Sequence, residues 1–180
     1  EPLHGTQVIV EAAALLAREG GVEITMIGTG PEREATVRLA AARAAPTLRF
    51  EDWVAYDQLP VRLADCDVAL GIFGSTPKTR MVIPTKAYQA AASGRAIVSA
   101  DTPALREVFT PDEHVLAVRS GDPDALAVAL RRLRDAPELA PRLGSAAGRL
   151  MAEHLGPGAQ GARLRSVLAE AFPDLAARLA

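Results

Sequence analysis

The sequence has few cysteines, aromatic residues and lysines, and these shortages exclude whole classes of protein. Cys66 is the one cysteine among 180 residues, so no internal disulfide can form and a reducing compartment is indicated. One Trp, two Tyr and four Phe leave the core to be built from Ala, Leu, Val and Ile. No uncharged apolar run approaches the ~20 residues that a transmembrane helix needs. A disulfide-stabilised scaffold is therefore excluded, and no transmembrane segment is expected.

Lysine is the scarcest charged residue. Of the 20 basic residues only Lys78 and Lys86 are lysines. The 22 acidic residues give a net charge of -2, which argues against nucleic acid or an anionic membrane as a partner. Positions 68–100 hold four basic residues and no acidic one, which leaves 16 basic and 22 acidic residues elsewhere, a net of -6. A cationic stretch with both lysines thus lies within an acidic chain.

The length of 180 residues predicts one domain that spans 1–180. The chain opens on Glu1 rather than Met and shows no signal-peptide pattern, so we expect it to begin within a larger protein. Together with the single cysteine, this predicts a cytoplasmic location, with the inner face of the membrane as the alternative for the intact protein.

Short apolar runs alternate with segments of helical periodicity. Strands are expected at 22–27, 48–54, 67–73, 96–100 and 115–118. Helices are expected at 6–18, 32–44, 57–63, 84–94, 104–109, 122–134, 137–153 and 159–179, with a loop at 74–83. The alternation predicts an α/β, Rossmann-like parallel sheet of about five or six strands with helices on both faces, followed by C-terminal helices. Such sheets bind ligands beyond the carboxyl ends of their strands, so the loops at Gly28, Trp53, Gly74 and Asp101 are the candidate site.

The loop Gly28-Thr29-Gly30-Pro31 follows a strand and opens a helix, so its backbone amides are free to meet an anion. A dinucleotide-binding fingerprint needs a third glycine at position 33, which is Arg33 here, although Glu51 stands near the end of the next strand. A tight structural turn, a ligand loop and a dinucleotide-binding domain all stay open at this point.

The stretch from Gly74 to Pro84 joins a strand to a helix and precedes Lys86. Proline suits a first helical turn, where free amides and the helix dipole favour negative charge. A lysine is slightly unfavourable there, so a bound anion would account for Lys86, while a solvated loop is the alternative. The three histidines are scattered without ligand spacing, so no metal site is expected.

Several short motifs stand in a characteristic order along residues 4–150. They are His4-Gly5, Glu11-Ala12-Ala13, Gly28-Thr29-Gly30-Pro31, 50–54, Ala64-Asp65-Cys66-Asp67-Val68, Lys86-Ala87-Tyr88-Gln89-Ala90 and Gly94-Arg95-Ala96-Ile97-Val98. In this order and spacing the chain resembles the C-terminal domain of family four glycosyltransferases. The resemblance implies a nucleotide-diphospho-sugar as the bound partner, and an acceptor-binding N-terminal domain that this chain lacks. It also implies sugar transfer with retention of configuration, without a catalytic metal or other cofactor.

Carried over by position, Gly28 and Gly30 form the loop near the donor, and Trp53 with Val54 lies where the family seats the nucleobase. His4 stands where the family usually has a phosphate-binding lysine. This is a departure, because a neutral imidazole donates one hydrogen bond but carries no charge. The family's partner arginine would lie upstream of the first residue.

The backbone of Met81, Val82 and Ile83 is implied to approach the diphosphate and the sugar. The family's two glutamates, which are separated by seven residues, fall on Lys78 and Lys86. An ammonium donates hydrogen bonds where a carboxylate accepts them, so we expect an altered donor geometry or donor type. Lys86 is expected to bind ribose oxygens or a phosphate. Lys78 is the catalytic candidate, offsetting the charge that develops on the departing diphosphate.

The leading hypothesis is the donor-binding half of a hexosyltransferase of glycan or polysaccharide biosynthesis, inactive when isolated. The dinucleotide-binding domain of an oxidoreductase is an alternative hypothesis. A degenerate, non-catalytic glycosyltransferase-like module is another. A titration with nucleoside diphosphates and nicotinamide cofactors would separate the first two.

Overall fold

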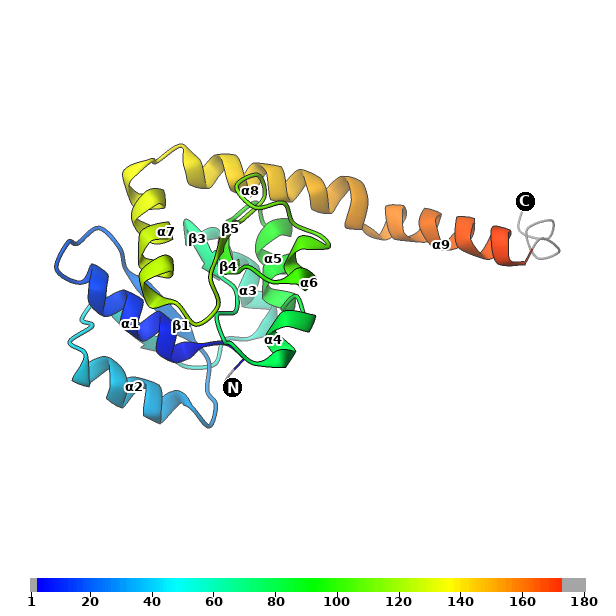
Figure 1. The fold of residues 1–180 in the computed structure, drawn as a ribbon. Coiled ribbons are helices and arrows are strands. Elements are labelled where there is room, and N and C mark those ends of the chain that lie inside the picture. Colours follow the sequence, from blue (N-terminus) through cyan, green and yellow to red (C-terminus); the bar gives the residue numbers. More distant parts are fainter. Residues whose placement is uncertain (1–2, 173–180) are drawn as a thin grey trace.

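The computed structural model describes residues 3–172 as strands and helices that alternate along the chain (Figure 1). The five strands of this part are β1 (Ile24–Ile27), β2 (Leu48–Glu51), β3 (Val68–Leu70), β4 (Ala96–Ala100) and β5 (Leu116–Val118). The helices before β5 are α1 (Thr6–Leu16), α2 (Arg33–Ala42), α3 (Leu59–Ala64), α4 (Pro77–Met81), α5 (Thr85–Ala92) and α6 (Pro103–Arg106), with a 3-10 turn η1 (Tyr56–Gln58). After β5 come α7 (Pro123–Asp135), α8 (Leu139–Leu150), a π-helical turn η2 (Met151–Leu155) and α9 (Pro157–Ala171).

All strand pairs of the described residues are parallel, as the alternation predicts. β1 pairs with β2, with Ile24 opposite Leu48, and β4 pairs with both β3 and β5. The expected sheet of five or six strands is present as five strands in two groups, β1-β2 and β3-β4-β5. The two groups share no backbone ladder within residues 3–172. Beyond the end of β3, Phe73 instead donates its N–H to the carbonyl oxygen of His4 at 3.2 Å.

The hydrophobic core lies on both faces of the strands. Successive residues of a strand point to opposite faces. On β4, Val98 therefore packs in the half of the core that includes Leu126 of α7, whereas Ile97 packs in the half that includes Ala90 of α5. Helices thus cover both faces, as the sequence predicts.

Helix α8 lies directly against the turn that joins α5 to β4. A Cβ atom added to Gly144 would stand 2.1 Å from the carbonyl oxygen of Gly94 and 3.1 Å from the backbone nitrogen of Ala96. One turn later, a Cβ atom on Gly148 would stand 3.4 Å from the carbonyl oxygen of Ala91. The contact is therefore closest at Gly144, where α8 has no room for a side chain.

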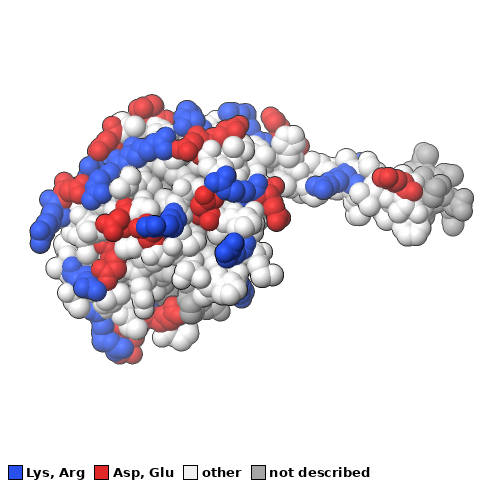
Figure 2. Space-filling view, in the orientation of Figure 1, with Lys and Arg blue, Asp and Glu red and all other residues white. Residues whose placement is uncertain are grey.

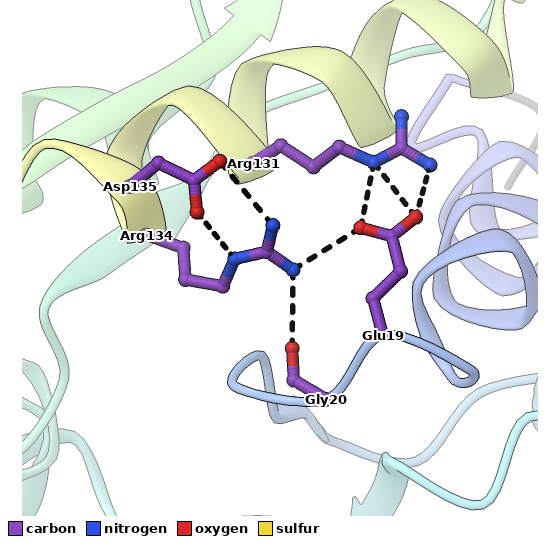
Figure 3. Close-up of polar contacts among 5 residues, drawn as sticks. All are labelled: Glu19, Gly20, Arg131, Arg134 and Asp135. Carbon is purple, nitrogen blue, oxygen red and sulfur yellow. Dashed lines mark hydrogen bonds and ion pairs between the residues drawn. The ribbon is translucent and has the colours of Figure 1, made fainter.

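A cluster of charged side chains joins the end of α1 to α7 (Figure 3). The Arg131 guanidinium donates to the Glu19 carboxylate, with the Nε–Oε1 distance at 2.9 Å. Arg134 donates to the same carboxylate and to the carbonyl oxygen of Gly20, both at 3.2 Å, and it also pairs with Asp135. The hydrogen bond from Arg131 is the main cause that lowers the pKa of Glu19. The two arginines thereby connect α7 to the turn after α1.

Helix α9 extends away from the rest of the molecule as an arm (Figure 1). None of its residues is buried, and Leu164 and Val167 are among its exposed apolar side chains. The sequence predicts this helix at 159–179; it begins two residues earlier, and 173–179 lies outside the described residues. No helix within residues 3–172 is long and apolar enough to cross a membrane.

Candidate functional site

The loop after β1 is fixed to the end of β2 by Arg33. Its Nη1 donates to the carbonyl oxygens of Gly28 at 2.8 Å and Glu51 at 2.6 Å, and its Nη2 lies 3.0 Å from Asp52. Gly28 has a φ of +127°, which non-glycine residues rarely adopt. A Cβ atom on Gly28 or Gly30 would meet nothing within 4 Å, so the space over the loop is open. Arg33 thus joins the base of this loop to the end of β2, and the space beside both glycines is open.

The same contacts bear on the dinucleotide-binding alternative. Arg33 fills the position of the missing third glycine and uses its guanidinium to join two loops. The Glu51 carboxylate, the acid that would have to accept hydrogen bonds from a ribose, forms an ion pair with Arg62. The residues that this alternative requires are therefore engaged within the protein.

Two aromatic side chains stand exposed after β2. The predicted strand 48–54 ends at Glu51, so Trp53 and Val54 lie in the loop that leads to η1. Trp53 is 70% exposed, and Tyr56 is 75% exposed with its hydroxyl 3.5 Å from the Gln89 amide nitrogen of α5. Val54 is half-buried. Large exposed rings beside a strand end offer flat apolar surface on which a planar group can stack.

The predicted loop 74–83 contains the short helix α4, so this prediction was wrong. The Thr76 side chain caps the helix by accepting a hydrogen bond from the Thr79 backbone N–H at 3.3 Å, and Thr79 is fully buried. Pro77 occupies the first helical position, where its missing N–H is not needed. The segment Thr76-Pro77 is the local signal that the sequence contained. Helix α4 presents Lys78 as an exposed side chain.

Beyond α4 the backbone becomes extended at Val82 and enters α5 after Pro84. Met81 is 77% exposed, and Val82 and Ile83 are half-buried. The first amides of α5 have no acceptor within the helix, as at any helix start. This strand-to-helix connection therefore places free backbone donors next to an exposed side chain.

Lys86 lies in the first turn of α5 and differs from Lys78 in its surroundings. Lys86 is half-buried, and this burial lowers the pKa of its ammonium to about 8. Among residues 3–172 it has no hydrogen-bond or ion-pair partner. Lys78 is thus an exposed cation, and Lys86 is a half-buried one without a counter-charge.

Charged side chains of both signs are interspersed over the face that Figure 2 presents. At the end of β4, the acidic side chain of Asp101 accepts two hydrogen bonds from Arg106 of α6, at 2.6 and 2.7 Å. The bidentate pairing raises the pKa of Arg106 and neutralises this acid locally. The carboxyl end of β4 therefore adds no uncompensated negative charge to the candidate site.

His4 is the remaining residue of the expected site. It is half-buried, and its backbone carbonyl accepts the hydrogen bond from Phe73 beyond the end of β3. Within the described residues no three His, Cys, Asp or Glu side chains are placed to hold a metal ion.

The candidate residues follow the ends of strands in both groups. Gly28 and Trp53 follow the paired strands β1 and β2, and α4 follows β3 of the other group. The bond between Tyr56 and Gln89 connects the second of these loops to α5. Sequence reasoning missed Arg33, Tyr56 and Gln89 as structural members of these strand ends.

Comparison with known protein families identifies the family of this chain. The family described as glycosyl transferases group 1 matches residues 1–135, three quarters of the chain. The chain belongs to this family. A search of curated protein sequences found no match. The resemblance to family four glycosyltransferases is thereby confirmed at the level of the family.

Solved structures share the fold of this glycosyl transferase group 1 chain. The C-terminal domain of the group 1 protein LpcC from Francisella tularensis matches with a TM-score of 0.73 and 18% identity, over 87% of this chain and 82% of that one. Sucrose-phosphate synthase from Thermosynechococcus elongatus matches with a TM-score of 0.79 and 19% identity, over 97% of this chain and 44% of that one. HepE from Anabaena, in complex with UDP-glucose, matches with a TM-score of 0.76 and 14% identity, over 94% of this chain and 46% of that one. The chain spans most of the isolated domain and less than half of the two longer proteins, and its Rossmann-like fold is that of the C-terminal domain.

Proposed function

We propose that this domain binds the nucleotide-diphospho-sugar donor of a glycosyltransferase at the carboxyl edge of its strands. The observation that supports the proposal is that an open glycine loop, an exposed tryptophan and a helix start in an acid-free stretch each come after the end of a parallel strand. Membership of the glycosyl transferases group 1 family supports it as well. HepE, a protein of the same fold, is described in complex with UDP-glucose, which makes a uridine nucleotide the first ligand to test.

The candidate roles follow from what each residue presents. Gly28 and Gly30 leave space for the donor above their loop. The exposed ring of Trp53, with Val54 beside it, seats the nucleobase. His4 stands near the end of β3, where we propose it contributes a hydrogen bond to a phosphate.

The connection from α4 to α5 supplies the contacts to the diphosphate and the sugar. We propose that the backbone of Met81, Val82 and Ile83 approaches these groups, because α4 ends at Met81, the chain is extended at Val82 and α5 starts after Pro84. We propose that Lys78, which is exposed on α4, offsets negative charge on the departing diphosphate. No metal is needed for this arrangement, because cationic side chains and amides supply the positive charge.

In the intact enzyme this domain would act together with an acceptor-binding domain to transfer a hexose with retention of configuration. Donor binding belongs to the domain described above, whereas acceptor binding requires a second wall of the cleft. We therefore expect the chain of 180 residues to bind the donor and to transfer no sugar by itself. Glycan or polysaccharide biosynthesis is the process in which we place the intact enzyme.

A titration of the chain with UDP, GDP, their glucose conjugates and NAD, followed by NMR amide shifts, tests the proposal. We expect one nucleoside diphosphate to shift the amides of the Gly28 loop, Trp53 and the segment 78–86. Shifts there with NAD and with neither diphosphate would support the oxidoreductase alternative. No shifts with any ligand would favour the non-catalytic module and refute donor binding.

Replacement of the exposed ring provides a sharper test. Because base stacking on an aromatic side chain contributes about 1–3 kcal/mol, Trp53→Ala should weaken binding of the preferred nucleotide roughly tenfold or more. The ring is mostly exposed, so the stability of the fold should stay within about 0.5 kcal/mol. Phe172→Ala is the matched control, since this exposed ring follows α9 and should leave nucleotide affinity unchanged. Equal affinity of both variants would argue against Trp53 as the nucleobase seat.

A further inference from the structure

The two strand groups leave one edge of β1 and one edge of β3 without a partner strand. Among the strands of residues 3–172, β1 pairs with β2 alone and β3 pairs with β4 alone. An unpaired strand edge presents a row of backbone N–H and C=O groups that another extended chain can bind. These two open edges are therefore candidate sites for the addition of a strand.

The hydrogen bonds between β1 and β2 show which groups of β1 lie on its open edge. Ile24 and Gly28 donate their N–H groups to carbonyl oxygens of the β2 segment, at 3.0 and 3.2 Å. Every second residue of a strand turns its backbone groups to the same neighbour. The N–H groups of Thr25 and Ile27 therefore lie on the side of β1 that has no partner strand.

The same alternation applies to β3. Gly71 donates its N–H to the carbonyl oxygen of Val98 in β4 at 2.8 Å, so the N–H groups of Val68 and Leu70 lie on the opposite side. Within residues 3–172 these two N–H groups and the two of β1 have no hydrogen-bond acceptor. These four groups are the open-edge amides.

The open edges have the sequence of internal strands. The residues of β3 are Val-Ala-Leu and are all half-buried, whereas every residue of β4, which has a strand on each side, is buried. Strand β1 (Ile-Thr-Met-Ile) has no charged residue either. Natural sheet edges are often protected by charged side chains, as β2 is by Arg49 and Glu51. Apolar composition without such protection favours β1 and β3 as inner strands of a larger sheet.

Both open edges border the same half of the core. Ile24 of β1 is buried in the cluster that includes Val98 of β4, and the half-buried side chains of Met26, Val68 and Leu70 pack against this cluster. All buried residues of helix α1 belong to it as well. The two strand groups thus lie under one layer of helices although no backbone ladder joins them.

The connections between strands indicate where a further strand would come from. Helices connect β1 to β2, β3 to β4 and β4 to β5, as parallel pairing requires. Helix α1 leads into β1 in the same way, but no strand precedes it within residues 3–172. The carbonyl oxygens of Leu3 and His4 accept hydrogen bonds from Gly74 and Phe73, both at 3.2 Å. The chain therefore enters α1 from a point just beyond the carboxyl end of β3.

We propose that one extended strand, parallel to β1 and β3, binds both open edges, and that polypeptide joined to the chain on the N-terminal side of Leu3 supplies it. This strand, α1 and β1 would form the crossover unit that already connects the other parallel pairs. The strand would have about five residues, the usual length for a sheet of this kind. The inference concerns the completion of the sheet and does not depend on donor binding.

Amide hydrogen exchange measured by NMR in two forms of the protein tests the inference. One form is the chain of 180 residues, and the other carries in addition the polypeptide encoded directly upstream, about ten residues, which is enough for one strand. In the shorter form we expect the four open-edge amides to exchange at least about tenfold faster than the amides of Ile24 and Gly71, which have partners. In the longer form all of these amides should exchange slowly.

The same upstream residues can also be added to the shorter form as a free peptide. We expect this peptide to protect the open-edge amides as the covalent segment does. A peptide of identical sequence with N-methyl groups on alternate residues is the matched control, because it keeps every side chain and loses the N–H donors of one edge. It should bind at least about tenfold more weakly, since each lost backbone bond weakens strand pairing.

A proline substitution examines the open edge of β1 directly. Thr25→Pro removes an open-edge N–H, and Thr25→Ala is the matched control because the Thr25 side chain is exposed. We expect the difference in urea midpoint between these two variants to be larger in the longer form than in the shorter one. An equal difference in both forms would show that no strand binds this edge.

Two exchange results would also overturn the inference. The first is slow exchange of the open-edge amides in the shorter form at low protein concentration, because the edges would then already be satisfied within the chain. The second is protection that increases with protein concentration, accompanied by a dimer in analytical sedimentation and unchanged by the upstream residues. That result would assign the open edges to a second copy of the chain.

Discussion

Replacement of Gly144 by alanine tests how closely α8 packs on the turn before β4. In most helices this change is favourable, because alanine has a helix propensity about 1 kcal/mol better than that of glycine. At this position the new Cβ atom would stand 2.1 Å from the Gly94 carbonyl oxygen and 2.8 Å from its carbonyl carbon. An ordinary contact requires about 3.4 Å or more, so α8 would have to move away by about 1 Å.

The neighbours at this point are backbone atoms, which cannot rotate out of the way as a side chain can. A shift of α8 would also disturb Leu143 and Ala147, which are fully buried on either side of Gly144. Overpacking of this kind costs about 1–3 kcal/mol, and more where the backbone is rigid. After the gain in helix propensity, we expect Gly144→Ala to lower the free energy of unfolding by about 2 kcal/mol.

Urea unfolding followed by circular dichroism measures this difference. Gly148→Ala, the same change in the same helix, is the matched control, because its Cβ atom would stand 3.4 Å from the nearest atom and needs little adjustment. For a domain of this size, about 2 kcal/mol corresponds to a loss of roughly 4–8 °C in Tm, while the control should stay near the wild type or above it. A Gly144→Ala variant as stable as the control would refute the close packing.

Three further changes test other parts of the structure. Glu19→Gln should lower the free energy of unfolding at neutral pH, because it removes the ion pairs that depress the pKa of Glu19. The wild type should lose this advantage as the pH falls below the ordinary glutamate value near 4.5. The urea midpoints of the two proteins should then converge. Arg33→Met removes the two Arg33 hydrogen bonds to the loops after β1 and β2 and leaves the bond from the Gly28 amide to the Glu51 carbonyl oxygen without their support. Hydrogen exchange of the Gly28 amide should become at least tenfold faster. Unchanged exchange would show that other contacts hold the loop. Truncation after Gly156 removes helix α9, which has no buried residue, so the urea midpoint of the remaining chain should not change. A clear decrease would mean that α9 stabilises the rest of the domain.

The sequence was sufficient to predict the alternating elements and the two-sided core, because both depend on the local spacing of apolar residues. In β4, the whole segment Ala96–Ala100 was predicted correctly, since every residue of it is buried and apolar or small. The parallel pairing of the strands also followed from this alternation, whereas the candidate site at their carboxyl ends stays a prediction.

Other features depend on contacts between distant residues, which no local pattern encodes. Strand 67–73 was predicted too long because Phe73, although fully buried, bonds to His4 rather than to a neighbouring strand. Arg33 was noted only as a missing glycine, since its bond to the Glu51 carbonyl spans 18 positions. Helix α4 was overlooked because five residues are too few for periodicity, and a threonine cap decides its start.

The arm formed by α9 also determines how the molecule rotates in solution. Its 15 residues span about 22 Å at the usual rise of 1.5 Å per residue. A compact body of some 155 residues has a radius of gyration of only about 15 Å. Rotational diffusion should therefore be anisotropic, with slower tumbling of the long axis, and backbone relaxation rates should depend on how each N–H bond is oriented relative to the arm.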